Sequence, residues 1–296
     1  MKLETFINLV TSGVVLAAIY ALMSVGLTMI YGITRVFNYG QSAFYTTTGY
    51  IAYVLFGAFG KSATAYIFVA ITSVSIISLM GFFYEKAIIS PLRKRSGSGD
   101  PLLTVLVVTI GFALALQNIL LVIFGSQNYS LPNSARGAIE YGMFYISMHD
   151  LITIFVSGGI MAALGAFLKY TRAGMAMRAV SQDPVGSRIV GMNHDFIFAL
   201  SFAIAAGLAG LSCIFLAPRT LLYPNVGWQT FIKSMVIIVF GGLGSIKGTL
   251  VASLILAFVE IFASFYFGGT WALPFFLGIM VLMFVFKPKG LFGKWG

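Results

Sequence analysis

Charged residues are scarce in this chain. Lys, Arg, Asp and Glu make up 9% of its 296 residues, whereas a soluble domain of ordinary composition has about 25%. Hydrophobic residues make up 59%, and the mean hydropathy is +0.97. So few charged side chains cannot cover so apolar an interior in water, which excludes a soluble globular protein. The net charge of +10 comes from loop positions and does not indicate nucleic-acid binding.

Cysteine and histidine are almost absent. Cys213 is the only cysteine, which excludes an intrachain disulfide. The two histidines, His149 and His194, show no metal-ligand spacing, so we predict no metal site and no enzyme active site. The glycine-rich run near residue 245 resembles a phosphate-binding loop. That loop needs Lys directly after its glycine, whereas here Lys247 precedes Gly248, so no nucleotide cofactor is predicted for this chain.

Long alternation of polar and apolar residues is missing too, which excludes a membrane β-barrel. The apolar residues instead form continuous runs, and about 20 such residues suffice for a helix to cross a bilayer. Because helices bond their own backbone groups in lipid, we predict an all-α polytopic membrane protein of about 8–10 helices in one domain, residues 1–296. The candidate spans are residues 6–32, 42–60, 64–89, 101–125, 148–168, 196–217, 229–244, 249–267 and 271–286.

Basic residues concentrate in three stretches, and loops on the cytoplasmic side carry an excess of Lys and Arg. The stretches are residues 91–100, residues 169–195 (called the polar loop below) and a tail with Lys287, Lys289 and Lys294. We predict all three to be cytoplasmic. Loops 126–147 and 218–228 hold only Arg136 and Arg219, respectively, and are predicted to face outward. Nine crossings then place the N-terminus outside and the C-terminus inside.

The polar loop contains the signals of a short helix. Asp183 is a preferred N-cap residue, Pro184 is favoured at the first helical position, and Gly191 favours the left-handed conformation that ends a helix. Between them fit about two turns, roughly 10 Å long, with Val185 and Ile189 on one face. A cytoplasmic loop explains the charge alone, whereas docking to a soluble partner also explains the capped helix and its apolar face. We therefore expect docking.

Glycine and polar residues interrupt two apolar segments, at 31–42 and 240–249. These segments lie in opposite halves of the chain and share a loose pattern. Transporters built from two repeated halves place broken helices at corresponding positions, where substrates pass. Ordinary cytoplasmic turns are the alternative. If the segments line a path, the candidate residues are Arg35, Asn38, Tyr39, Gln41, Gly241, Gly242, Gly244 and Ser245.

Glu260 is the one acidic residue that we expect deep within a span. An ionisable group in that position suggests a functional site by default. Lys233 is expected at a similar depth in the preceding span, however, so a structural Lys233–Glu260 ion pair is the simpler interpretation. A proton or cation relay would need more acidic residues inside the membrane than one.

Four stretches together resemble the permease subunits of branched-chain amino-acid ABC importers of the LivH type, and the resemblance covers nearly the whole chain. They are GLTMIYGITRVFNYGQSAFY (26–45), TIGFALALQNILLVIFG (109–125), AMRAVSQDPVGSRIVGMN (176–193) and VFGGLGSIKGTLVASLILAFVE (239–260). By this resemblance the polar loop is a coupling loop that docks into a groove of a cytoplasmic ATPase. The coupling residues it implies are Arg178, Asp183, Pro184, Arg188 and Gly191.

The resemblance implies a non-enzymatic transport subunit in a bacterial-type cytoplasmic membrane, moving branched-chain or other hydrophobic amino acids inward. It implies a second, similar permease, two ATPase subunits that bind ATP and Mg, and an extracytoplasmic binding protein. The stretch Tyr39–Phe44 departs from the usual family pattern, so urea, amides and aromatic acids stay open as substrates. An ion-coupled secondary transporter and a non-transporting scaffold are the alternatives from other classes.

Overall fold

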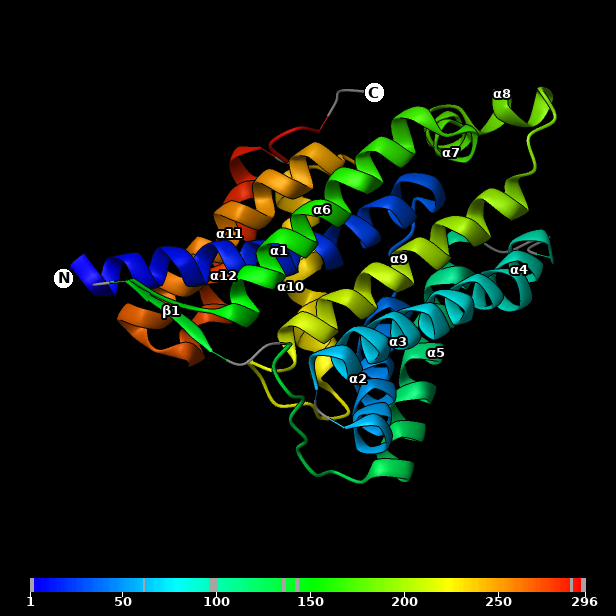
Figure 1. The fold of residues 1–296 in the computed structure, drawn as a ribbon. Helices are drawn as coiled ribbons and strands as arrows, with labels where there is room; N and C mark the ends of the chain where they lie inside the picture. The colour runs from blue at the N-terminus through cyan, green and yellow to red at the C-terminus, as the bar shows by residue number, and fades with distance from the viewer. Residues whose placement is uncertain are drawn as a thin grey trace.

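The computed structural model describes residues 3–60, 62–95, 101–134, 137–141, 144–287 and 290–293. Within them the chain forms nine long helices, one for each predicted span, which confirms the all-α membrane fold (Figure 1). The helices are α1 (Leu3–Thr34), α2 (Gly40–Phe59), α3 (Ala63–Tyr84), α5 (Pro101–Phe124), α6 (Met148–Tyr170), α9 (His194–Leu216), α10 (Val226–Gly241), α11 (Ile246–Phe267) and α12 (Ala272–Phe286). Arg136, Lys289, Lys294 and residues 96–100 lie outside the described residues.

Seven of the described helical segments are long and apolar enough to cross a membrane. One of them joins α3, a π-helical turn (Glu85–Ile89) and α4 (Ser90–Arg95) into a continuous span from Ala63 to Lys94. The two remaining long helices are α2, which is polar in its first half, and α10, which has only 16 residues. A short 3₁₀ turn, Gly269–Trp271, leads into α12.

Helices α1 and α9 form the centre of the bundle. In their most apolar windows 89% and 78% of the residues are buried, against 17% in α5. Glycines allow α9 to approach its neighbours closely. A Cβ added to Gly81 of α3 would lie 2.6 Å from the Cβ of Ala206, and one added to Gly210 would lie 2.9 Å from Oγ1 of Thr48. Larger residues at these positions would push the helices apart.

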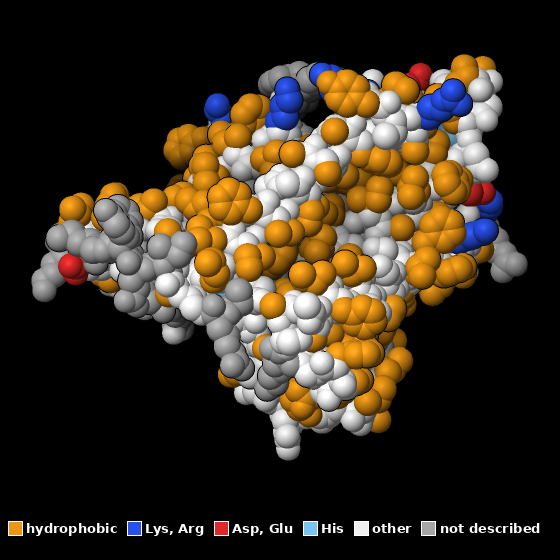
Figure 2. Space-filling model, viewed as in Figure 1, with side chains coloured by type: hydrophobic (Ala, Val, Ile, Leu, Met, Phe, Trp, Pro, Cys, Tyr) orange, Lys and Arg blue, Asp and Glu red, His pale blue; other side chains and the backbone are white. Residues whose placement is uncertain are grey.

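The two ends of the bundle differ in character. One end, which we call the hairpin end, carries a two-stranded antiparallel hairpin of β1 (Ala138–Tyr141) and β2 (Phe144–Ser147). The other, the loop end, carries α4, α7 (Arg172–Gln182) and α8 (Pro184–Ile189). In Figure 2 the Lys and Arg side chains lie along the upper and right margins; Figure 1 places α7, α8 and α4 toward the right of these margins and the upper end of α11 toward the left. Hydrophobic side chains cover most of the face between the two ends.

The two interrupted segments meet at the loop end. A Cβ added to Gly244 would lie 3.6 Å from Cα of Gly32, and the hydroxyl oxygens of Thr28 and Thr249 are 2.7 Å apart. The segment 240–249 is a tight turn between α10 and α11, and the tail covers it, because the Leu291 amide donates to the Phe240 carbonyl at 2.8 Å.

The segment 31–42 is less regular. Helix α1 ends at Thr34, and Arg35 turns the chain with a φ of 58°, which is uncommon for a residue other than glycine. The non-helical backbone that follows enters the interior, since Asn38 is only 2% exposed. This stretch therefore has the form expected of irregular backbone at membrane depth, which occurs where protein surrounds it.

The tight turn between α10 and α11 depends on the absence of a side chain at Gly248, where a Cβ would collide with the Gly241 carbonyl oxygen. We expect Gly248→Val to lower the apparent melting temperature of the detergent-purified protein by several degrees, because overpacking costs about 1–3 kcal/mol. The matched control is Gly278→Val in α12, where nothing lies within 4 Å of the added Cβ. Equal melting temperatures for the two variants would contradict this interpretation.

Candidate docking surface and its connections

The start of helix α8 is fixed by the residues that the sequence singled out. The Asp183 side chain accepts hydrogen bonds from the amides of Val185 at 3.1 Å and Gly186 at 2.9 Å, and Pro184 is the first helical residue. These contacts bond two amides that a helix start otherwise leaves unpaired. The start of the short helix is therefore well defined.

The end of α8 is equally well defined. Gly191 has a φ of 78°, and its amide donates to the Arg188 carbonyl at 3.0 Å. The Met192 amide reaches back to the Ser187 carbonyl at 3.1 Å. This pair of bonds is the Schellman motif, in which a left-handed glycine lets the chain close over the last turn. A side chain at position 191 would strain this closure.

Helix α8 leaves large aliphatic side chains uncovered. Val185 is 70% exposed, Ile189 80% and Val190 71%. Figure 1 places α8 beyond the N-terminal end of α9, at the tip of the loop end. An exposed apolar side chain on the flank of the bundle would face lipid, but α8 itself lies past the end of the bundle. An apolar face in that position is typical of a surface that another protein covers.

A second helix in the polar loop, α7, was not predicted from the sequence. Thr171 caps it by accepting a hydrogen bond from the Gly174 amide at 3.0 Å, and Gly174, Met177 and Val180 are its buried residues. The Thr cap and the three-residue spacing of Met177 and Val180 were the available signals. Arg178 lies on α7 rather than on α8, is exposed, and donates to the Lys169 carbonyl at 3.4 Å.

Helix α7 connects the polar loop to the first interrupted segment. The Ser181 hydroxyl donates to the Gly32 carbonyl at 2.9 Å, and the Arg35 guanidinium donates to the Ser181 carbonyl at 3.4 Å. Ser181 was not among the predicted site residues, because nothing local indicates a contact with a residue 149 positions away. The contact places Arg35 beside the loop, at the surface.

Helix α8 connects to the bundle through α9. The Ser187 hydroxyl and His194 Nε2 are 3.0 Å apart, and His194 is only 8% exposed. His194 is thus a structural contact at the first residue of α9. Deeper along α9, the Ala205 carbonyl accepts a hydrogen bond from Gln41 Nε2 at 2.7 Å. Movement of α8 would therefore be passed to a central helix that holds the start of α2.

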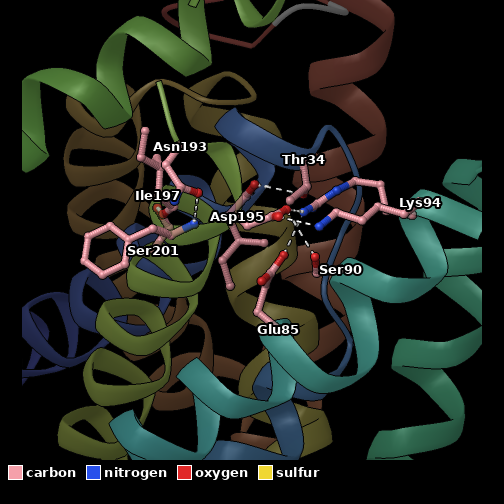
Figure 3. Close-up of polar contacts among 11 residues, drawn as sticks. Thr34, Glu85, Ser90, Lys94, Asn193, Asp195, Ile197 and Ser201 are labelled. Carbon is pink, nitrogen blue, oxygen red and sulfur yellow. Dashed lines mark hydrogen bonds and ion pairs between the residues drawn. The ribbon is translucent and has the colours of Figure 1, made fainter. Parts of the chain in front are cut away.

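Between α4, α8 and α9 lies a groove of about 440 Å³. Its lining is rich in charged and polar side chains, namely Arg93, Lys94, Arg188, Met192, Asn193, His194, Asp195 and Phe198. Figure 3 shows Asp195 pointing toward Lys94 and Ser90, with Glu85 beside them. Asp195 forms an ion pair with Lys94 and accepts a hydrogen bond from Ser90 at 3.2 Å. We call this the loop-end groove.

Glu85 corrects the expectation that Glu260 is the one acidic residue deep within a span. Glu85 is fully buried in the span Ala63–Lys94, where the π-helical turn begins. Its carboxylate accepts a hydrogen bond from Arg93 at 2.9 Å. A π-helical turn shifts the register of a helix by about one residue and is frequent at functional sites, and here Glu85 is its first residue and Arg93 lies beyond its end, in α4.

Three of the four predicted path residues of the first segment, Asn38, Tyr39 and Gln41, lie within the bundle, whereas Arg35 is exposed at its surface. Tyr39 packs on Phe231 and Trp228, with ring centroids 4.9 and 5.8 Å apart. Asn38 and Gln41 are buried, and each has one polar atom, Nδ2 and Oε1 respectively, that finds no partner in the described parts of the chain. These atoms could bond water or a polar solute.

The predicted path residues of the second segment have local roles in the turn. Gly241 and Gly242 allow close backbone approach to residues 248 and 293, Gly244 has a φ of 80°, and Ser245 caps α11 by accepting from the Gly248 amide at 3.1 Å. Whether either segment lines a path stays a prediction.

Lys233 and Glu260 lie together, with Nζ 2.6 Å from Oε1. Tyr20 completes the cluster by donating to Oε2 of Glu260 at 2.6 Å, and the Lys233 ammonium donates to its hydroxyl at 3.0 Å. Each carboxylate oxygen therefore has a donor. Among the described residues no group of three His, Cys, Asp or Glu side chains lies close enough to hold a metal ion.

Removing one partner of this cluster should cost more than removing both. We expect Glu260→Leu or Lys233→Leu alone to destabilise the protein by roughly 3 kcal/mol, because each leaves an unpaired charge in the bundle. The double variant should recover most of that loss. Thermal unfolding of the four proteins in the same detergent measures this, and additive losses would contradict a direct ion pair.

Comparisons with known proteins agree with this architecture. The chain is 28% identical over 300 residues to the high-affinity branched-chain amino acid transport system permease protein BraD of Pseudomonas aeruginosa, covering 98% of this chain and 96% of that protein. It is 28% identical to LivH of Escherichia coli, again covering 98% and 96%, and 24% identical to LivM of the same species, covering 93% and 68%.

A solved structure, PsaBC from Streptococcus pneumoniae in complex with Fab, shares the fold. The TM-score is 0.52 at 16% identity, over 97% of this chain and 93% of that chain. The family described as branched-chain amino acid transport system, permease component, matches residues 9–286. With that match spanning nearly all of the helical bundle, the chain belongs to the branched-chain amino acid transport permease family.

Proposed function

We propose that this chain is a permease subunit that moves branched-chain or other hydrophobic amino acids inward, powered by separate ATPase subunits that bind ATP and Mg. The observation that carries the proposal is α8, a capped helix that presents Val185 and Ile189 to solvent beyond the bundle. A permease that worked alone would have no use for such a face. The relatives named for branched-chain amino acids suggest the substrate class.

The proposed orientation places the loop end in the cytoplasm of a bacterial-type cell. Described basic residues of the polar loop, of α4 and of the tail all belong to that end, whereas Arg219 pairs with Asp150 at the hairpin end at 2.5 Å. An excess of Lys and Arg marks the cytoplasmic side. The C-terminus, which follows α12 to the loop end, would then be cytoplasmic and the N-terminus of α1 extracytoplasmic.

The proposed assembly contains a second permease, two ATPase subunits and an extracytoplasmic binding protein. The similarity of this chain to both LivH and LivM supports a pair of related permeases. The exposed face of α8 supports an ATPase on the loop side. A binding protein would deliver the substrate at the hairpin end.

The proposed mechanism uses the two connections of the polar loop. Closure of the ATPase dimer on ATP would displace α8, which is bonded to α9 through Ser187 and His194. The same movement would act on Gly32 through Ser181. A ligand shifts a conformational equilibrium only by its differential affinity for the two states. Because both ends of α8 are capped, the helix would move as a rigid body when the ATPase dimer closes.

An ion-coupled transporter is the alternative, and Glu260 is the residue that separates the two. Its carboxylate is held by Lys233 and Tyr20, an arrangement suited to a fixed charge. If uptake by the Lys233→Leu, Glu260→Leu double variant in vesicles stays at the wild-type level per folded protein, an ion relay through Glu260 is excluded.

Ile189→Asp tests docking directly. We expect it to weaken ATPase binding roughly 100-fold, because an apolar side chain worth about 2–3 kcal/mol on burial is replaced by a charge. Binding of purified ATPase to the reconstituted permease pair measures the effect, and amino-acid uptake should fall with it. Since Ile189 is 80% exposed, membrane insertion and melting temperature should not change.

Ile189→Leu is the matched control, because it keeps an apolar side chain of equal volume. It should bind the ATPase within about threefold of wild type. Normal ATPase binding by Ile189→Asp would remove α8 as the docking element.

A further inference from the structure

The loop-end groove opens beside α8, the proposed docking helix, and its side chains carry an excess of positive charge. Arg93, Lys94 and Arg188 line it, and the acidic residues at hand are Glu85 and Asp195. Three cations against two anions leave one positive charge. The distribution of pairs shows which residue carries that charge.

Arg93 and Lys94 are already paired. Arg93 donates to the buried Glu85 carboxylate at 2.9 Å, and its guanidinium stacks on the Phe198 ring at 3.9 Å from the centroid. Lys94 pairs with Asp195, which also lies 3.7 Å from Arg93. These contacts join α4 to the start of α9 and hold the groove open as a fixed wall.

Arg188 carries the unpaired charge. It is exposed on α8, and within the described parts of the chain no acidic side chain lies within ion-pair distance of it. The Ser187–His194 contact fixes the helix that carries it against α9. A guanidinium on a fixed helix over a groove is well suited to bind a carboxylate or phosphate in a bidentate manner.

Two sources of anion meet this end of the molecule, an acidic protein side chain and a phospholipid headgroup. The position of α8 favours protein. Arg188 lines the groove and immediately precedes Ile189. A protein that covers the exposed apolar face of α8 would therefore also contact the opening of the groove. Figure 1 shows α8 past the end of α9 rather than along the flank of the bundle, where lipid lies.

We propose that the loop-end groove receives an acidic side chain of the ATPase, whose carboxylate pairs with Arg188 between α8 and α4. The proposal rests on the proposed function, since it specifies the chemistry of the same docking partner. It makes the ATPase contact both halves of the permease at once, α4 from the first half and α8–α9 from the second. The ATPase would then contact α8 and also α4 and α9, the two helices against which α8 would move.

The test uses the reconstituted permease pair in nanodiscs and its purified ATPase. Arg188→Glu should weaken ATPase binding roughly 30-fold, because it sets two carboxylates against each other. Replacing the exposed acidic residues of the ATPase with Arg, one at a time, should identify one that restores binding to Arg188→Glu within about threefold, as a direct pair requires. Lys247→Glu is the matched control, since Lys247 is an exposed cation of the loop end outside the groove.

Three outcomes would overturn the proposal. Arg188→Glu could bind the ATPase as wild type does, or no charge reversal on the ATPase could restore binding. Alternatively, the binding defect of Arg188→Glu could disappear in nanodiscs that contain no anionic lipid, which would identify the headgroup of an anionic lipid as the ligand of Arg188. Failure of the proposed function can be distinguished from failure of this proposal alone. If the proposed function is wrong, the wild-type permease pair binds no ATPase, and Ile189→Asp cannot weaken that binding further.

Discussion

The requirement that every backbone polar group be bonded within the protein governs this fold. Lipid offers no hydrogen bonds, so each crossing is a helix and irregular backbone survives only inside the bundle. The stretch after Arg35 obeys this rule. The Asn38 side chain accepts a hydrogen bond from the Gly40 amide at 3.1 Å and so supplies the bond that a helix would have provided.

The same constraint explains how the bundle treats its charges. Glu260 and Glu85 lie in different helices, and each is held by a cation, Lys233 at 2.6 Å and Arg93 at 2.9 Å. A charge taken out of water is tolerated when it is paired; both oxygens of Glu260 have a donor, whereas Oε2 of Glu85 finds none in the described parts of the chain. The Lys233–Glu260 cluster joins α10 to α11 and, through Tyr20, to α1, and the Glu85–Arg93 pair joins the π-helical turn to α4. The first cluster therefore links the first helix of the chain to two late ones, and Arg93 and Lys94 also link α4 to α9 through Asp195.

Much of the fold could be predicted from the sequence because its signals are local. Nine apolar runs gave nine helices, with ends within a few residues of the prediction, since the length of a span is set by the bilayer. Helix α8 was predictable for the same reason, as Asp183, Pro184 and Gly191 act on their immediate neighbours. The proposed docking helix therefore depended on no long-range contact.

What escaped prediction depends on contacts between distant residues. Ser181 is 149 positions from Gly32, and Lys94 is 101 from Asp195. No periodicity or cap indicates such pairs. Helix α7 was missed because its charged residues resemble an ordinary cytoplasmic loop. The loop-end groove was missed because its walls come from α4 and α9, which meet only in the folded chain.

Three long-range contacts, made by Ser181 and Ala205, converge on the non-helical stretch of residues 35–41. Ser181 of the polar loop holds Gly32 and Arg35 at one end of it, and Ala205 of α9 holds Gln41 at the other. The polar loop is bonded to α9 through Ser187 and His194. A displacement of the loop thus acts on both ends of residues 35–41, and it does so where the helical backbone is interrupted. A regular helix there would resist such a displacement, whereas a non-helical segment can absorb it by changes in a few dihedral angles.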